Sequence, residues 1–109
     1  MVKNLDGVSA EDGAPVPSEQ IPVAVTAGEL VYSDGATQTF TPDGATRYVD
    51  GGNQTEGTWS VTDDGFFCSF WPPTYRASYD LRWMVENGTI VGLRFQDIKS
   101  KASFNACYT

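Results

Sequence analysis

The sequence predicts an all-β domain: an antiparallel meander of about seven strands that forms a small barrel or a strongly curled sheet, with one short N-terminal helix. Three observations predict this class. Turn sequences recur at short intervals, the runs between them are rich in Thr, Val, Tyr, Phe and Trp, and only one short segment carries a helix-start pattern. With 109 residues the chain is long enough for one domain and too short for two independent cores.

Turn sequences separate the predicted strands at five places: TPDGA at 41–45, DGGN at 50–53, DDG at 63–65, WPPT at 71–74 and ENGT at 86–89. Gly, Asn and Asp tolerate the left-handed backbone that tight hairpins require, and Pro restricts the backbone at a turn. Strands are therefore expected at 36–41, 45–49, 54–62, 66–71, 78–85, 89–96 and 102–108.

The first twenty residues are rich in Gly, Pro, Ser and acidic side chains and show no hydrophobic periodicity. This composition predicts a flexible N-terminal arm at 1–20, followed by a single β domain at 21–109. The TAGE sequence at 26–29 has the spacing of a capping box, in which Thr26 and Glu29 satisfy backbone donors at a helix start. The SDG sequence at 33–35 then ends this helix after one or two turns.

The ENGT hairpin has a register that can be worked out from its side chains. A two-residue loop would set Leu81 opposite Arg94, mixing apolar and charged groups on one face. A three-residue loop at 86–88 keeps one face apolar and sets Asp80 opposite Arg94 on the other. Its apolar pairs are Trp83 with Val91, Leu81 with Leu93 and Tyr79 with Phe95.

A two-residue Asp64-Gly65 loop is expected in the DDG hairpin, setting Trp59 opposite Phe70. The predicted core side chains of this hairpin are Trp59, Val61, Phe66, Cys68 and Phe70. Phe67 and Trp71 are then left on the outer face. With Met84 and Ile90 of the neighbouring hairpin they make an apolar patch, which predicts a homodimer through this face.

Composition excludes several functions. The formal net charge is −7 and no run of Lys or Arg occurs, so neither nucleic acid nor an anionic membrane surface is an expected partner. No apolar stretch reaches the roughly 18 to 20 residues that membrane insertion by a helix requires. The sequence contains no histidine, which removes Ser-His triads and most zinc sites.

The two cysteines, Cys68 and Cys107, are too few for a cysteine-only metal site, so we expect no metal and no cofactor. Free thiols are favoured over a disulfide, because Cys68 is expected to point into the core and Cys107 away from it. The compartment is left open: a native Met1 indicates a cytoplasmic protein, whereas residues 2–20 also read like the leader of a mature exported or periplasmic chain.

The WPPTYRASYD segment at 71–80 brings a cation and several aromatic side chains to one rim of the predicted sheet. In one interpretation Arg76 supplies the charge of an anion-tolerant ligand mouth, and Trp71 and Tyr75 supply its walls. In the other the segment is a proline-stiffened crossover whose arginine lies along the surface.

The succession of TAGEL, TFTPDGATRY, GTWSVTDDGFFCSF and YDLRWMVENGTIVGLRF resembles the small lipocalin-like (calycin-type) proteins of bacteria. The Gly57-Thr58-Trp59 strand start is similar to the G-x-W pattern of lipocalins, although it falls on the third predicted strand instead of the first. The resemblance implies an antiparallel meander around a pocket. The VENGTIVGLRFQD segment also resembles the last strands of nuclear-transport-factor-like proteins, but that fold needs long N-terminal helices for which the first 35 residues leave no room.

Three functions are weighed. The first is a small-molecule binding module for an apolar or amphipathic ligand, with candidate ligand-binding residues Trp59, Trp71, Tyr75, Arg76, Tyr79, Trp83 and Phe95. The second is a self-associating interaction protein without a ligand. The third is a histidine-independent lyase or isomerase that uses Tyr75, Arg76, Asp80 and Arg94. Because no evident base is present, the first two are favoured over an enzyme, and a pocket of at least about 300 Å³ would favour binding.

Overall fold

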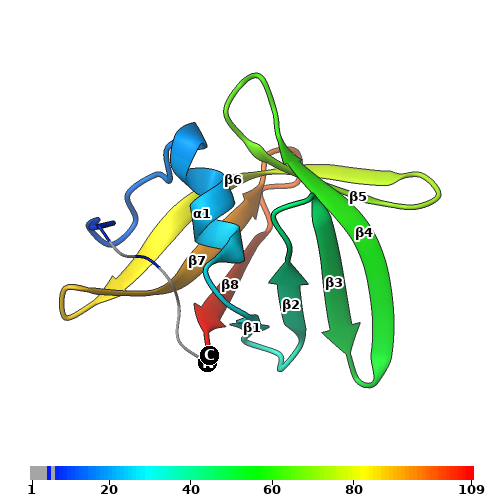
Figure 1. Ribbon diagram of the computed structural model, residues 1–109, viewed down its shortest axis with the longest axis horizontal. Helices are drawn as coiled ribbons and strands as arrows, with labels where there is room; N and C mark the ends of the chain where they lie inside the picture. Colours follow the sequence, from blue (N-terminus) through cyan, green and yellow to red (C-terminus); the bar gives the residue numbers. More distant parts are fainter. Residues whose placement is uncertain (1–4, 6) are drawn as a thin grey trace.

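The computed structural model describes residue 5 and residues 7–109, and its strands form a closed antiparallel barrel in chain order (Figure 1). The eight strands are β1 (Leu30–Tyr32), β2 (Thr37–Phe40), β3 (Ala45–Asp50), β4 (Asn53–Val61), β5 (Phe67–Trp71), β6 (Tyr75–Glu86), β7 (Thr89–Asp97) and β8 (Ser103–Tyr108). Each strand pairs with the next, and β1 also pairs with β8, which closes the barrel. The predicted all-β class, antiparallel order and single short α-helix are confirmed.

The strand that sequence reasoning did not expect is β1, where the capping box predicted a helix. The helix α1 (Ile21–Thr26) instead ends at Thr26, after a 3-10 turn η1 (Ser18–Gln20). Pro22 fits in its first turn because the backbone N–H groups there have no partner within the helix. The Thr26 hydroxyl donates back to the Pro22 carbonyl at 2.6 Å instead of capping a following helix. The capping-box prediction was therefore wrong.

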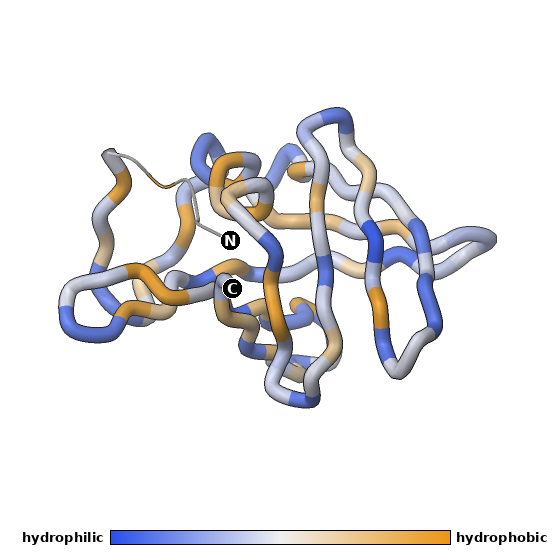
Figure 2. Tube along the Cα trace, turned by 60° about the horizontal axis from the view of Figure 1, so that its bottom comes forward, coloured by the Kyte–Doolittle hydropathy of each residue, from blue (hydrophilic) through white to orange (hydrophobic). Residues whose placement is uncertain are grey.

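All five predicted turns connect consecutive strands. Asn87 and Gly88 form a two-residue β6–β7 turn with φ of 53° and 76°, the left-handed backbone that tight hairpins require. Most hairpin turns are hydrophilic in Figure 2, as expected for segments that lie at the surface. No helix within the described part of the chain is both long and apolar enough to span a membrane.

The β6–β7 register differs from the predicted one. Glu86 pairs with Thr89 and Val85 with Ile90, as a two-residue loop requires, but an irregularity between Met84 and Val85 then shifts the pairing. Beyond it Trp83 pairs with Leu93 and Leu81 with Phe95. A β-bulge places one extra residue in one strand, and here it restores an apolar inner face that a regular two-residue hairpin would have lost. The predicted inward direction of Leu81, Trp83, Leu93 and Phe95 is correct, whereas their predicted partners are not, and Ile90, predicted on the outer face, is buried.

Asp80 does not meet Arg94 across this hairpin. It pairs with Gln96, and its carboxylate instead accepts from the guanidinium of Arg82 on its own strand, at 3.1 Å. Asp80 and Arg94 are not paired because the bulge shifts the pairing of the two strands.

The β4–β5 register also differs from the predicted one. The difference exchanges the side chains of β5 that face inward with those that face outward. Val61 pairs with Phe67 and Trp59 with Ser69, around a three-residue loop closed by a hydrogen bond from the Thr62 amide to the Phe66 carbonyl at 2.8 Å. Because strand side chains alternate, a slip of one residue moves every side chain to the opposite face. Phe67 consequently lies inside the barrel with only 2% of its surface exposed, and Cys68 and Phe70 are on the other face.

The apolar outer face predicted for Phe67, Trp71, Met84 and Ile90 is therefore absent. Phe67 is in the core, Ile90 is buried, and Trp71 lines the interior pocket described below. Homodimerisation itself stays a prediction, without this patch to support it.

The core occupies the end of the barrel next to α1. Three α1 side chains, Ile21, Ala24 and Val25, are buried among Leu30, Leu81, Trp83 and Leu93 of the strands. The Tyr108 hydroxyl donates to the Ala24 carbonyl at 2.6 Å, which ties α1 to β8. The side chain of Ser18 lies 3.5 Å from the position of a Cβ on Gly65, so η1 lies against the β4–β5 turn. The helical segment thus covers the end that holds the β2–β3, β4–β5 and β6–β7 turns.

Residues 12–16 extend the sheet by bonding to the free edge of β6. The strand β5 pairs with β6 only as far as Tyr79, so residues 81–85 of β6 pair with β7 on one side and have no β5 partner on the other. The backbones of Gly13, Ala14 and Val16 bond to Trp83 and Leu81 at 2.9 to 3.0 Å, and the Asp12 carboxylate accepts from the Val85 amide at 3.0 Å. Val16 is buried against the core. The flexibility expected for residues 1–20 stays a prediction, but apolar packing begins before residue 21.

Candidate functional site: a pocket at the barrel mouth

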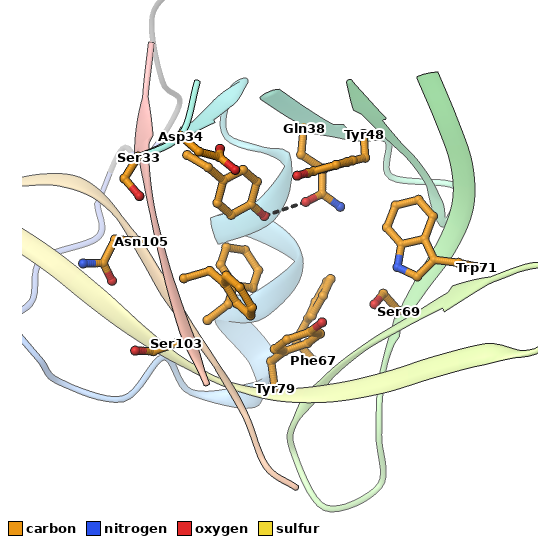
Figure 3. A pocket seen from close by; sticks show the side chains of 13 residues that line it. Ser33, Asp34, Gln38, Tyr48, Phe67, Ser69, Trp71, Tyr79, Ser103 and Asn105 are labelled. Atoms are coloured by element: carbon orange, nitrogen blue, oxygen red, sulfur yellow. Dashed lines mark hydrogen bonds between the residues drawn. The ribbon is translucent and has the colours of Figure 1, made fainter. Parts of the chain in front are cut away.

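The barrel contains a pocket of about 400 Å³ at the end opposite to η1 and α1. Its outer lining stands beside the β1–β2, β3–β4, β5–β6 and β7–β8 turns, and Phe67, Ser69, Tyr79 and Phe95 line it within the barrel. Aromatic lining comes from Tyr32, Tyr48, Phe67, Trp71, Tyr79, Phe95 and Phe104, and polar lining from Ser33, Asp34, Gln38, Ser69, Ser103 and Asn105. Figure 3 looks into this pocket, with α1 behind the lining side chains.

Small and large side chains alternate on the inner face of β5, and this pattern leaves the space open. Phe67, Ser69 and Trp71 point inward together because they are two positions apart along the strand. Ser69 is 3% exposed and lies opposite Ala77 of β6, so two small side chains face each other where aromatic groups would fill the barrel. The small side chains at this level of the barrel therefore leave the pocket open.

The wall of the pocket is a continuous series of aromatic contacts. Ring centroids are 6.4 Å apart for Trp71 and Tyr48, 6.0 Å for Tyr48 and Tyr32, 6.0 Å for Tyr32 and Phe95, 6.0 Å for Phe95 and Tyr79, and 6.1 Å for Tyr79 and Phe67. Most of these pairs are tilted or edge-to-face, which is the favoured arrangement of aromatic quadrupoles. Such contacts hold the aromatic wall in place.

Hydrogen bonds fix the polar side of the wall. The Tyr32 hydroxyl donates to Gln38 Oε1 at 2.5 Å, a bond drawn as a dashed line in Figure 3. Gln38 Nε2 donates to Thr46 Oγ1 at 2.9 Å, and the Thr46 hydroxyl donates to the Thr39 carbonyl at 2.9 Å. Among the described residues, every buried side-chain nitrogen and oxygen has a partner. The network is complete, so it can hold Tyr32 and Gln38 in one orientation.

The pocket tyrosines are neutral hydrogen-bonding groups. Burial raises the pKa of Tyr32 far above its ordinary value. Burial, with smaller effects of Tyr75 and Asp97, raises the pKa of Tyr79 to about 12. Burial together with the charges of Asp34 and Asp50 also raises the pKa of Tyr48. None of the three hydroxyls can act as a base near neutral pH.

Asp34 is the one carboxylate among the described residues that line the pocket. It lies in the β1–β2 turn, where its Oδ1 accepts from the Ala36 amide at 3.0 Å. This Asx turn explains why an aspartate suits the position locally. The lining formed by the described residues contains no Lys or Arg.

Three of the seven candidate residues, Trp71, Tyr79 and Phe95, line the pocket together. Trp83 is a core residue with 2% of its surface exposed, and Trp59 stacks against Phe67 with its indole nitrogen donating to the Thr41 carbonyl at 2.9 Å. Both lie outside the lining. A role of any of the seven in binding stays a prediction.

The remaining two candidates do not form the expected anion-tolerant mouth. Tyr75 is 57% exposed and does not belong to the pocket lining. Arg76 pairs with Phe70, and its guanidinium carbon lies 4.8 Å from the centroid of the Phe70 ring. The arginine therefore lies along the outer face, as in the crossover interpretation.

Sequence reasoning missed Tyr32, Asp34, Gln38 and Tyr48. Tyr32 and Asp34 were assigned to a helix end and its stop signal, so neither could be placed on a strand face. The alternation along the predicted strands at 36–41 and 45–49 could have placed Gln38 with Phe40, and Tyr48 with Thr46, on the inner face.

The residues weighed for a lyase or isomerase do not meet in this pocket. None of Tyr75, Arg76, Asp80 and Arg94 belongs to the lining formed by the described residues. Asp80 bonds to Arg82, and Arg94 donates to Asn105 at 3.1 Å. The described part of the chain also holds no group of three His, Cys, Asp or Glu side chains positioned for a metal ion.

Comparison with known proteins found no matching family model, no matching curated protein and no matching solved structure. The closed eight-stranded antiparallel barrel is compatible with a lipocalin-like fold.

Proposed function

We propose that this protein is a small-molecule binding module, whose mouth pocket holds a ligand with an apolar, ring-sized body. The observation that carries the proposal is the pocket of about 400 Å³ within an aromatic wall. Ligand sites in proteins range from about 300 to 1,000 Å³ and are lined mainly by apolar and aromatic side chains with a few polar groups. A barrel evolved only for stability would fill this space with side chains, since empty volume costs packing energy.

The polar lining supports an amphipathic ligand. Ser69, Ser103 and Asn105 add hydroxyl and amide groups to the wall beside the fixed Tyr32–Gln38 pair. A few convergent polar groups of this kind orient a ligand whose body packs on the rings. The resemblance to lipocalin-like proteins supports the same class of function.

The test uses a pocket-filling substitution and a matched control. Ser69→Leu adds a branched side chain inside the pocket, whereas Ser60→Leu makes the same change on the exposed face of the adjacent strand. Each protein is titrated with the neutral fluorescent probe N-phenyl-1-naphthylamine, and native mass spectra of the purified chains are recorded for co-purified ligand. We expect binding by the native protein and by Ser60→Leu, and at least about tenfold weaker binding by Ser69→Leu.

Equal probe affinity in the native protein and Ser69→Leu would contradict the proposal, because the probe would then bind elsewhere. The absence of both probe binding and a co-purified ligand would contradict it as well.

A further inference from the structure

The pocket lining holds two kinds of group that can attract a cation. The first is the set of aromatic rings, whose faces are negative and whose edges are positive. Six rings, those of Tyr32, Tyr48, Phe67, Trp71, Tyr79 and Phe95, contact one another around the cavity. The second is the Asp34 carboxylate in the lining.

Asp34 lies on the tyrosine side of the pocket mouth. Figure 3 places it beside Ser33 at the top of the pocket, on the same side as Gln38 and Tyr48. Its charge contributes to the raised pKa of both Tyr32 and Tyr48, so the carboxylate acts on both phenol groups. Oδ1 is engaged by the Ala36 amide, and no described residue donates to Oδ2.

Nothing in the described lining compensates this charge. The lining holds no Lys or Arg, and the arginine expected at this rim, Arg76, is stacked on Phe70 outside the pocket. The protein as a whole carries a formal charge of −7, so its long-range field also favours cations over anions. An anionic ligand would lose its hydration here without gaining a cationic partner.

We infer that the pocket selects ligands that carry an ammonium group on an apolar body, with Asp34 as counter-ion and the neighbouring aromatic rings as a cation-binding wall. This inference rests on the proposed binding function and names its ligand class. The apolar body packs between Phe67 and Phe95 in the interior. The ammonium group stays at the mouth, where Asp34, Tyr48 and Trp71 lie and water remains in reach.

The neutral tyrosine hydroxyls are suited to this arrangement. A phenol that keeps its proton still offers oxygen lone pairs to an ammonium N–H, and it adds no second charge to that of Asp34. The combination of one carboxylate with aromatic faces distinguishes a cation from a neutral molecule of the same shape, which the rings alone do only weakly.

The experiment compares three ligands that share a phenyl ring and differ in charge. They are 2-phenylethylamine, 2-phenylethanol and 3-phenylpropanoate, titrated calorimetrically into the native protein at neutral pH. We expect the amine to bind about tenfold more tightly than the alcohol, and the carboxylate to bind most weakly.

Two variants test which carboxylate attracts the amine. Asp34→Asn removes it while keeping a side-chain oxygen for the Ala36 amide, so the turn is retained. Asp64→Asn makes the same charge change in the β4–β5 turn, at the opposite end of the barrel. We expect Asp34→Asn to bring the amine affinity down to that of the alcohol without changing the alcohol affinity, and Asp64→Asn to leave all three unchanged.

Three outcomes overturn the inference and leave the proposed function standing. One is an alcohol that binds as tightly as the amine in the native protein and is lost in Ser69→Leu. Another is an amine affinity that Asp34→Asn does not lower. A protein that binds the naphthylamine probe but none of the phenyl compounds also overturns the ligand class alone, whereas failure of the naphthylamine test removes the proposed function itself.

Discussion

The indole of Trp71 on β5 lies directly against the backbone of Gly57 on β4. A Cβ at position 57 would be 2.7 Å from Trp71 Cε3 and 2.4 Å from the Phe70 carbonyl oxygen, distances that real Cβ atoms do not adopt. Glycine at 57 therefore makes room for the indole, which turns toward Tyr48 and forms one wall of the pocket. The glycine of the G-x-W pattern therefore has a packing role in this chain: it leaves space for the Trp71 indole.

Gly57→Ala should destabilise the protein and disturb the pocket. The added methyl group must displace either the β5 backbone or the Trp71 ring, an overpacking that costs about 1 to 3 kcal/mol. Urea unfolding measures the loss, and weaker binding of the naphthylamine probe to the folded variant reports the moved indole. Gly92→Ala is the control: its Cβ would lie 2.0 Å from the Ala106 carbonyl oxygen, outside the pocket lining, so stability should fall while probe affinity is kept. A Gly57→Ala protein as stable as the native chain would contradict the close approach.

Trp83→Ala should cost roughly 3 to 5 kcal/mol in the free energy of unfolding, the usual range for removing a buried aromatic side chain. The indole is 2% exposed and belongs to the core between α1 and the strands. Tyr75→Ala removes an aromatic group that is 57% exposed and should change stability by less than about 1 kcal/mol. Chemical denaturation of both variants checks the contrast, which would vanish if Trp83 were at the surface.

Stability should fall at alkaline pH because of Tyr79. Burial raises its pKa in the folded protein to about 12, from a value of 10.0 for an unburied tyrosine. A raised folded-state pKa means that the folded chain holds the proton more tightly than the unfolded chain. The resulting stability is fully present below about pH 10 and is lost as the pH rises toward 12.

Tyr79→Phe should therefore make the unfolding free energy less steeply dependent on pH between about 10 and 12. Urea titrations at several pH values measure this slope, with tyrosinate absorbance recorded in parallel. An identical slope in the variant would show that Tyr79 ionises equally well in the folded and unfolded chain.

The N-terminal segment should contribute to stability through Val16. This side chain is 6% exposed within the core cluster, and its amide donates to the Leu81 carbonyl at 3.0 Å. Val16→Asp places a carboxylate in that apolar site and should cost at least about 2 kcal/mol. Val23→Asp makes the same exchange on the exposed side of α1, where Val23 is 43% exposed, and should have little effect. Equal, small effects would show that residues before 21 form a mobile arm in solution.

The two thiols should react at different rates. Cys68 is buried, Cys107 is exposed, and neither forms a disulfide. A thiol reagent should therefore label Cys107 in the native protein and reach Cys68 only after unfolding, which peptide mass spectrometry can assign residue by residue. If neither thiol were labelled until a reductant was added, the result would instead reveal a disulfide bond between them.

The local sequence determined the fold class and the hairpin positions. Gly51, Gly52, Asn87 and Gly88 occupy left-handed backbone in the structure, and turn chemistry of this kind is readable without knowledge of the rest of the chain. The inward direction of Leu81, Trp83, Leu93 and Phe95 was readable too, since alternation along β6 and β7 needs only neighbouring residues.

Only the tertiary structure decided which side chains form the pocket. The β4–β5 loop has three residues instead of the two predicted, and that difference of one residue turns Phe67, Ser69 and Trp71 inward. β1 has three residues and forms because β2 and β8 offer it hydrogen-bonding partners on both sides, far apart in the chain. Tyr32 and Asp34 reach the pocket through that closure, and because pairing between distant strands leaves no local signal, no periodicity near residue 30 could have placed them there.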